Sequence, residues 1–240
     1  MSSTAVLPYG SCCAKYDALV HALQEIAEQA DSGTVFWTKP LSGRFRYDAG
    51  KAVLDAHLHL SGWKWRSDSS KHRLHILLRV RETIQCSDKA LFASNVHVDH
   101  YLVKEGTAKL LQSMHFDFAG EEDCHPVFHA QVCADPISLD SQTATELEFD
   151  FAVDSSAVSC FRDARIPTSD MTVASVLLCL AADHLGKPFF CQFRDKAIDL
   201  QPHLPQPAFA LLKQSLTAEP QHLSSSHWFT HTITEREPEQ

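Results

Sequence analysis

Glycine is scarce in this sequence, with 8 residues among 240, and the nucleotide-binding motifs that depend on it are missing. The chain has no G-x-G-x-x-G and no G-x-x-x-x-G-K-[ST], the motifs whose glycines let backbone N–H groups approach a phosphate. It also has no G-x-S-x-G nucleophile elbow and no H-E-x-x-H zinc motif. These absences argue against ATP- and NAD-dependent chemistry and leave no familiar catalytic signature.

Long apolar runs are missing as well. The longest, Met171–Leu185, is interrupted by four polar residues and is too short and too polar to span a bilayer. Residues Met1–Gly10 carry neither the basic nor the apolar region of a secretory signal. The 8 cysteines include no C-x-x-C pair, which is typical of reduced, structural thiols. We therefore expect a cytoplasmic protein that makes no membrane contact.

Cations are outnumbered by anions. The 21 Lys and Arg against 30 Asp and Glu give a net charge of −9, which disfavours a general nucleic-acid or anionic-membrane binder. Hydrophobic residues make up 44% and charged residues 21%, values typical of a soluble globular protein. One residue type is abundant, because the chain contains 15 histidines.

The hydrophobic pattern predicts a helix first and then a long run of strands. Apolar residues recur at helical spacing from Tyr16 to Ala30, and Asp31-Ser32-Gly33 ends the pattern. From Lys51 to Asp154 the period changes to two, which predicts six consecutive strands. The residues that define them are 54–60, 74–80, 92–102, 110–118, 128–132 and 147–153. After Gly62 the parity flips to Trp63 and Trp65, as a β-bulge produces.

Helical texture returns after the strands. Met171–Leu185 is apolar nearly all round and is predicted to be a helix buried under the sheet. Phe189–Phe193 reads as a short strand and Pro205–Leu216 as a further helix, while Thr34–Tyr47 reads as an irregular connection with one short strand. The predicted fold is α+β: a roughly six-stranded antiparallel meander with an N-terminal amphipathic helix and C-terminal helices on one face. Residues 1–217 form one domain in this interpretation, and 218–240 form a loosely ordered tail.

Strand parity predicts a polar face that is rich in histidine. If the apolar side of each strand faces the core, residues at spacings of two and four share the opposite side. Neighbouring strands lie about 4.8 Å apart, so these side chains are close enough to meet. The residues on this side are His57, His59, His75, Arg79, Arg81, His97, Asp99, Tyr101, His115, Asp117, His125, His129 and Cys133.

Imidazole and carboxylate groups together fit two chemical uses. They are ligands for zinc or manganese, and such a divalent metal activates water for hydrolysis. They also supply a general acid and base near neutral pH. The central strands provide metal ligands in His97, Asp99, His125 and His129, and catalytic groups in His115 and Asp117. A purely structural interpretation stands beside these, in which the histidines hydrogen-bond across the sheet, with His57 and His59 as bystanders.

A second candidate surface is the basic, aromatic hairpin that begins at Trp63. Its indoles and cations could stack on and contact a single-stranded nucleic acid, although the net charge disfavours that partner. The alternative is a solvated hairpin with its tryptophans at the domain edge. The residues proposed for binding here are Trp63, Trp65, Arg79 and Arg81.

Two functions from different classes follow. The first is an intracellular, non-catalytic binding or assembly module that engages a protein partner through the polar sheet face or the hairpin. The second is a metal-dependent hydrolase, of phosphodiesterase or nuclease type, with His and Asp ligands on the central strands. The first is preferred because missing motifs are broad evidence, whereas the second depends on strand parity, which a one-residue register error inverts.

Overall fold

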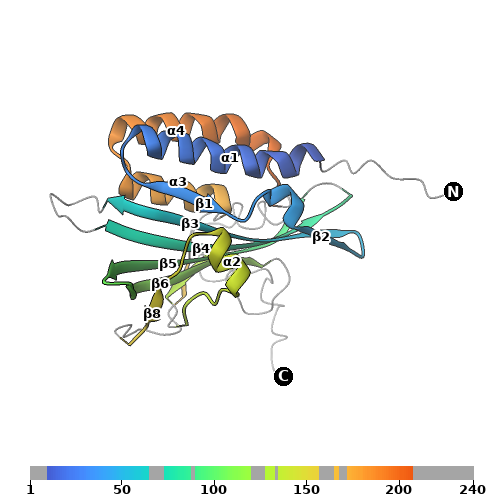
Figure 1. The fold of residues 1–240 in the computed structure, drawn as a ribbon. Helices are drawn as coiled ribbons and strands as arrows, with labels where there is room; N and C mark the ends of the chain where they lie inside the picture. The colour runs from blue at the N-terminus through green and yellow to red at the C-terminus, as the bar shows by residue number, and fades with distance from the viewer. Residues whose placement is uncertain are drawn as a thin grey trace, which may run out of the picture.

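One mixed, mostly antiparallel sheet organises the chain (Figure 1). The structure is a computed structural model, and it describes residues 10–64, 73–87, 90–119, 128–132, 135–156, 165–167 and 172–207. Its helices are α1 (Gly10–Gln29), α2 (Ser141–Glu146), α3 (Val173–His184) and α4 (Lys187–Leu200), with short 3₁₀ helices η1 (Leu41–Arg44) and η2 (Gln201–His203). No helix among these is long and apolar enough to cross a membrane.

Five consecutive strands form the meander that the sequence predicts. They are β3 (Lys51–Lys64), β4 (Arg73–Gln85), β5 (Ala90–Lys104), β6 (Thr107–Ala119) and β7 (Phe128–Val132), each antiparallel to the next. Shorter strands extend this sheet: β1 (Thr34–Trp37) and β2 (Phe45–Asp48) pair with β3, and β9 (Arg165–Pro167) pairs with β7. Two short pairings are parallel, β8 (Ala152–Asp154) with β6 and β10 (Gln206–Pro207) with β5.

The predicted β-bulge near Gly62 is present. The register of β3 against β4 shifts between Leu60 and Trp63, and Gly62 has a φ of +71°. Glycine adopts this left-handed conformation without the steric cost that a Cβ brings. Because of the shift, Leu60 and Trp63 are both fully buried in the same core.

The larger core lies between the sheet and three helices. Figure 1 shows α1, α3 and α4 together on one face of the sheet, with the long strands beneath them. The even-numbered residues of β3 and β4 face these helices, in agreement with the predicted parity. The side chains that meet here include Leu19, Leu23, Leu54, Leu58, Leu78, Val80, Val96, Leu177 and Phe193.

A second, smaller core lies on the opposite face of the sheet. Residues 135–151, which we call the covering segment, include α2 and cross one end of that face. Ile137, Leu147 and Phe149 of this segment are buried against Leu77 and Tyr101 of the sheet. Both faces of the sheet are therefore covered at this end.

Part of the predicted secondary structure is wrong, and the covering segment accounts for one error. Residues 147–153 alternate like a strand, but Leu147 has helical backbone angles and Glu148 has a φ of +50°. Leu147 and Phe149 both contact the sheet from outside, so the alternation comes from packing and not from an extended chain. Only β8, at the end of this range, is a strand, and it is parallel to β6.

The second error is the predicted strand at Phe189–Phe193, which lies inside α4. Pro188 sits in the first turn of that helix, where a proline favours helix initiation. Of the predicted helix Pro205–Leu216, only the first residues are described, and Gln206–Pro207 pair with β5 as β10. The predicted tail 218–240 lies outside the described residues.

Candidate functional site

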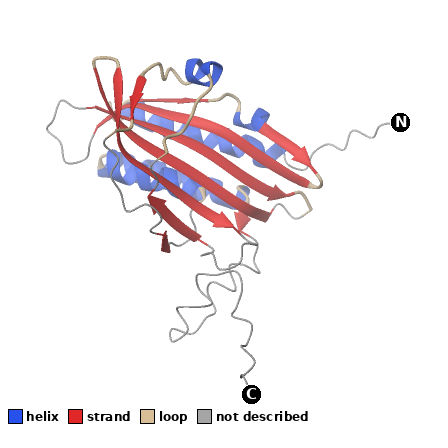
Figure 2. Cartoon of the chain, turned by 90° about the horizontal axis from the view of Figure 1, so that it is seen from below, coloured by secondary structure: helices blue, strands red, loops and turns tan. Residues whose placement is uncertain are grey.

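The pairing of the strands places the predicted polar residues in rows across the sheet. His57 of β3 pairs with Arg79, Arg79 with His97, His97 with His115 and His115 with Gln131 of β7. A second row runs beside the first through Asp55, Arg81, Asn95 and Asp117. Figure 2 views this side of the sheet, with α1, α3 and α4 behind it. We call the side chains of both rows the polar face: Asp55, His57, Arg79, Arg81, Asn95, His97, His115, Asp117 and Gln131.

Two histidine–carboxylate pairs occupy the middle of the sheet. His97 Nε2 lies 3.1 Å from Asp99 Oδ1, and His115 Nε2 lies 3.1 Å from Asp117 Oδ2. The two imidazole rings are edge to face with their centroids 6.3 Å apart. His115 Nε2 is also 3.2 Å from Oε1 of Gln131, and Asn95 donates a hydrogen bond to Asp117. The polar face is therefore cross-linked by its own side chains.

Asp99 is fully buried between the polar face and the covering segment. Its Oδ2 accepts hydrogen bonds from the Tyr101 hydroxyl at 2.9 Å and from the backbone N–H of Ile137 at 2.7 Å. Burial, with the nearby Asp99 charge, raises the pKa of Tyr101, which keeps its hydroxyl protonated as a donor. Asp99 thus ties the covering segment to the sheet.

The geometry around His97 does not match a nucleophilic triad. Ser113 Oγ lies 2.7 Å from His97 Nε2, the same nitrogen that faces Asp99. A catalytic imidazole uses one nitrogen for the nucleophile and the other for the carboxylate. Ser113 is also fully buried, so a substrate carbonyl could not reach its hydroxyl. These residues form a structural hydrogen-bond cluster.

Of the predicted metal ligands, His97 and Asp99 lie together on adjacent positions of one face. His125 lies outside the described residues, and only the backbone of His129 is described, where it pairs with Asp117. Within the described part of the chain, no group of three or more His, Cys, Asp or Glu side chains is placed to hold a metal ion. Cys133 also falls outside that part.

The predicted basic, aromatic surface is not assembled as expected. Trp63 is fully buried on the helix side, where its ring packs edge to face against His184, because the bulge turns it inward. Arg79 and Arg81 lie on the opposite side of the sheet, in the polar face. Nε and Nη2 of Arg79 donate to the two carboxylate oxygens of Asp55, at 3.1 and 2.9 Å. Trp65 lies outside the described residues.

A chain of hydrogen bonds joins three groups beside the polar face. His59 Nδ1 lies 2.8 Å from the carbonyl oxygen of Leu147, and its Nε2 lies 3.0 Å from Nδ1 of His75. A carbonyl only accepts, so Nδ1–H of His59 donates to Leu147 and Nε2 accepts from His75. Burial lowers the pKa of His59 to about 4 and also lowers the pKa of His75. These neutral rings hold the covering segment in place, and His59, predicted to be a bystander of the histidine cluster, lies outside the rows of the polar face.

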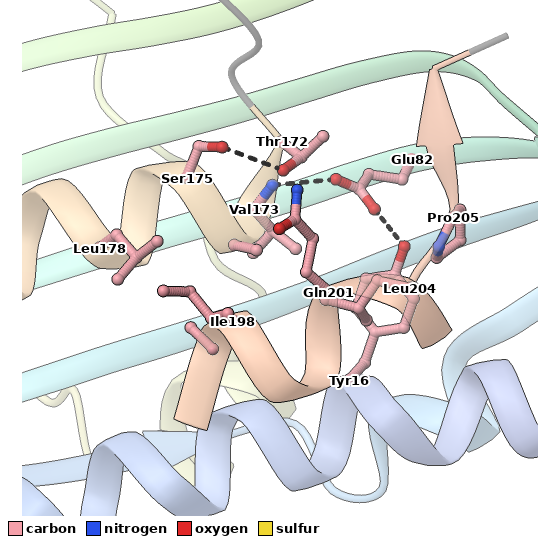
Figure 3. Close-up of a pocket in the computed structure, with 12 residues that line it drawn as sticks. Tyr16, Glu82, Thr172, Val173, Ser175, Leu178, Ile198, Gln201, Leu204 and Pro205 are labelled. Carbon is pink, nitrogen blue, oxygen red and sulfur yellow. Dashed lines mark hydrogen bonds between the residues drawn. The ribbon is translucent and has the colours of Figure 1, made fainter. Parts of the chain in front are cut away.

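The helix side of the sheet contains a pocket that the sequence analysis did not identify. Its volume is about 90 Å³, and its wall comes from α1, β4, α3, α4, η2 and the residues after η2 (Figure 3). Glu82 of β4 lies at the polar end, although it is almost completely buried. Its carboxylate accepts hydrogen bonds from Tyr16, from Ser94 Oγ at 3.1 Å and from the N–H of Val173 at 3.0 Å.

A signal for this pocket is present in the sequence. Glu82 continues the apolar side of β4, after Leu78 and Val80 and before Ile84, so it is an acidic residue at a core position. Tyr16 likewise lies on the apolar side of the first helix. An ionisable group in an otherwise apolar stripe is typical of a satisfied buried network or of a site.

Comparison of the chain with protein-family models, with curated proteins and with solved structures finds no match in any of the three.

Proposed function

We propose that this chain is a non-catalytic binding module that engages a protein partner through the polar face. The observation that supports this most directly is the row from His57 to Gln131, which the backbone ladder holds in fixed register across five strands. The side chains remain partly exposed: Arg79 by 43%, His115 by 23% and Asp117 by 18%. Side chains that already contact one another lose less conformational entropy when a partner binds.

The mixture of donors and acceptors favours recognition over chemistry. One row carries imidazole, guanidinium and amide groups, and the second row beside it has carboxylates at both ends, so a partner surface with complementary polar groups gains specificity and orientation. The carboxylates are already engaged by neighbours, as Asp55 is by Arg79. Burial raises the pKa of Asp55, but the hydrogen bond and the charge of Arg79 lower it by more. The pKa of Asp55 therefore lies below its ordinary value. Asp55 therefore stays charged at neutral pH and acts as an acceptor.

The test uses the exposed Arg81 of the polar face and the exposed Lys196 of α4 as a matched pair. A photo-cross-linking residue at position 81 should capture a discrete partner from an extract of the source organism, and one at position 196 should not. With that partner purified, Arg81→Glu should weaken binding at least about tenfold, while Lys196→Glu leaves it unchanged. The thermal midpoint should be the same in both variants. Equal capture from both positions, or equal affinity of both variants, would refute the proposal.

The alternative function is a metal-dependent hydrolase that uses zinc or manganese. The observation in its favour is the pair of histidine–carboxylate contacts on adjacent strands, with the backbone of His129 opposite Asp117. Elemental analysis of protein purified without chelators decides this alternative. A stoichiometric ion in the wild type that is absent from His115→Ala would support the hydrolase. If no ion is bound after zinc and manganese are offered, the hydrolase is refuted.

A further inference from the structure

We infer that the pocket beside Glu82 is a binding site for a small primary ammonium ligand with a short apolar tail. The site is independent of the polar face, because the sheet separates the two: Glu82 lies on the helix side. The charge of the pocket, its shape and the cost of burying a carboxylate support this assignment.

The ionisable groups that line the pocket determine its charge. Among the described residues that line the pocket, Glu82 is the single ionisable carboxyl group, and Lys, Arg and His are not among them. The N–H of Val173 can only donate to this carboxyl group, and the hydroxyls of Tyr16 and Ser94 are placed to donate to it as well, so donors surround it. The positive end of α3 offsets part of this charge. A cation is therefore the charge type that the pocket favours.

Burying the carboxylate of Glu82 in the core costs free energy. Glu82 pairs across the sheet with Leu54 and Ser94, and all three are almost completely buried. Replacing a buried charged group by a well-packed apolar residue is often neutral or stabilising. An acidic residue at this core position therefore calls for an explanation beyond stability, and a site that uses the carboxylate supplies one.

The shape of the pocket gives it a polar end and an apolar end. Figure 3 shows Glu82 at one end of the pocket and Leu178 and Ile198 towards the other. Ile198 lines the pocket and is 53% exposed, which places it at the mouth. A pocket of about 90 Å³ holds several waters, or a ligand of roughly five non-hydrogen atoms. An ammonium group at Glu82 would leave a short alkyl tail against Leu178 and Ile198.

The hydroxyl and amide groups of the wall supply further contacts. Thr172 and Ser175 are joined by a hydroxyl–hydroxyl contact of 3.3 Å, and Gln201 of η2 lies across from them. The hydroxyl oxygens of Thr172 and Ser175 can each accept an N–H bond. An ammonium carries three donors, so one can reach Glu82 while the others bond to these oxygens.

The test titrates the full-length, isotope-labelled chain with three molecules of matched size: isobutylammonium chloride, the neutral alcohol 2-methylpropan-1-ol and sodium isobutyrate. The ammonium should shift the amide NMR signals of Val173, Ser175 and Gln201 saturably, with a dissociation constant in the millimolar range. The alcohol should bind at least about tenfold more weakly, and the carboxylate should produce no saturable shift. Equal binding of all three, or no saturable shift from any, would overturn the inference.

Two variants locate the site. Glu82→Gln keeps the shape of the side chain and should abolish the preference for the ammonium over the alcohol. Because Glu82 also binds Val173 and Tyr16, this variant tests the site only if it folds. Ile198→Trp changes an exposed residue at the mouth, so this variant should fold. Its affinity for the ammonium should be at least about fivefold lower than that of the wild type. Unchanged affinity in Ile198→Trp would also overturn the inference.

Discussion

Gly33 lies where the chain leaves the turn after α1 and enters β1. Its φ of +131° suits glycine, and a Cβ here would lie 2.4 Å from the carbonyl oxygen of Ser61 and 2.8 Å from Cδ1 of Trp63. Both contacts are shorter than real Cβ atoms make, and neither neighbour is a flexible chain end. We therefore expect Gly33→Ala to destabilise the protein by about 3 kcal/mol, from backbone strain and from the clash together.

The matched control for this prediction is Gly50→Ala. Gly50 also has a positive φ, +79°, but a Cβ there would meet nothing within 4 Å. Its cost should be the conformational strain alone, about 1 kcal/mol. Urea unfolding curves of both variants measure the difference. Equal losses in the two variants would show that the packing of Gly33 against Ser61 and Trp63 contributes nothing.

At the scale of single residues, sequence parity predicts which side of a strand a residue occupies but not what covers it. The alternation in β5 and β6 placed His97 and His115 on the same side, because a period of two leaves no other choice in a regular strand. It could not show that Asp99 is fully buried, since the covering segment lies far along the chain. Trp63 shows the limit of the hairpin interpretation: the bulge was predicted, but not which side it turns the ring towards.

The covering segment is held in place by buried aromatic packing against the sheet and by an ion pair. Phe149 packs edge to face against His59 and at a tilt against Tyr101, and only 5% of it is exposed. The same segment makes an ion pair at 2.6 Å between Arg44 and Glu146, whose side chains are about one third exposed. Buried aromatic area outweighs a partly exposed ion pair, because solvent screens the latter.

We expect Phe149→Ala to loosen the covering segment and Glu146→Gln to leave it nearly intact. The first should cost about 3 kcal/mol and the second less than about 1 kcal/mol. Hydrogen exchange measured by mass spectrometry should show faster exchange across residues 137–149 in Phe149→Ala, with β3 and β4 unchanged. If Glu146→Gln produced the larger effect, the ion pair and not the aromatic packing would hold this element.

Elements with one long, consistent period were predictable, and elements defined by distant contacts were not. The strands β3 to β6 and the helix α1 have that period over many residues, and hairpin connections fix their order. The covering segment mimics a strand because two of its apolar side chains contact the sheet from outside. The pocket escaped prediction for a related reason, since Tyr16, Glu82, Val173 and Gln201 come from four separate elements that only tertiary packing brings together.

Several histidines of the molecule are fully or partly buried, and this affects how its stability changes with pH. Burial lowers the pKa of His59 and of His100 to about 4, and it lowers the pKa of His57, His75 and His184 as well. In the unfolded chain these rings titrate near 6.5. The unfolded state therefore binds more protons than the folded state between these values.

The sign of the effect follows from that difference. The contribution of a buried neutral histidine is complete above pH 6.5 and is lost progressively as the pH falls from about 6.5 to about 4. For His59 and for His100 the loss is of the order of 3 kcal/mol each. Domains of this kind have a free energy of unfolding of about 5–15 kcal/mol, so mild acid should remove a large part of it.

His100→Leu separates the contribution of this histidine from the rest. His100 packs beside His184, and its Nδ1 is buried without a hydrogen-bond partner among the described residues, so a leucine there breaks no bond. Urea unfolding at pH 7, 6 and 5 should show a shallower decline in the variant than in the wild type, by up to about 1.4 kcal/mol per pH unit. Besides burial, the charge of His184 lowers the pKa of His100 and the charge of Asp99 raises it. An identical decline in both proteins would mean that His100 titrates alike in the folded and unfolded chain, and the acid sensitivity would then belong to His59 and its hydrogen bond with the covering segment.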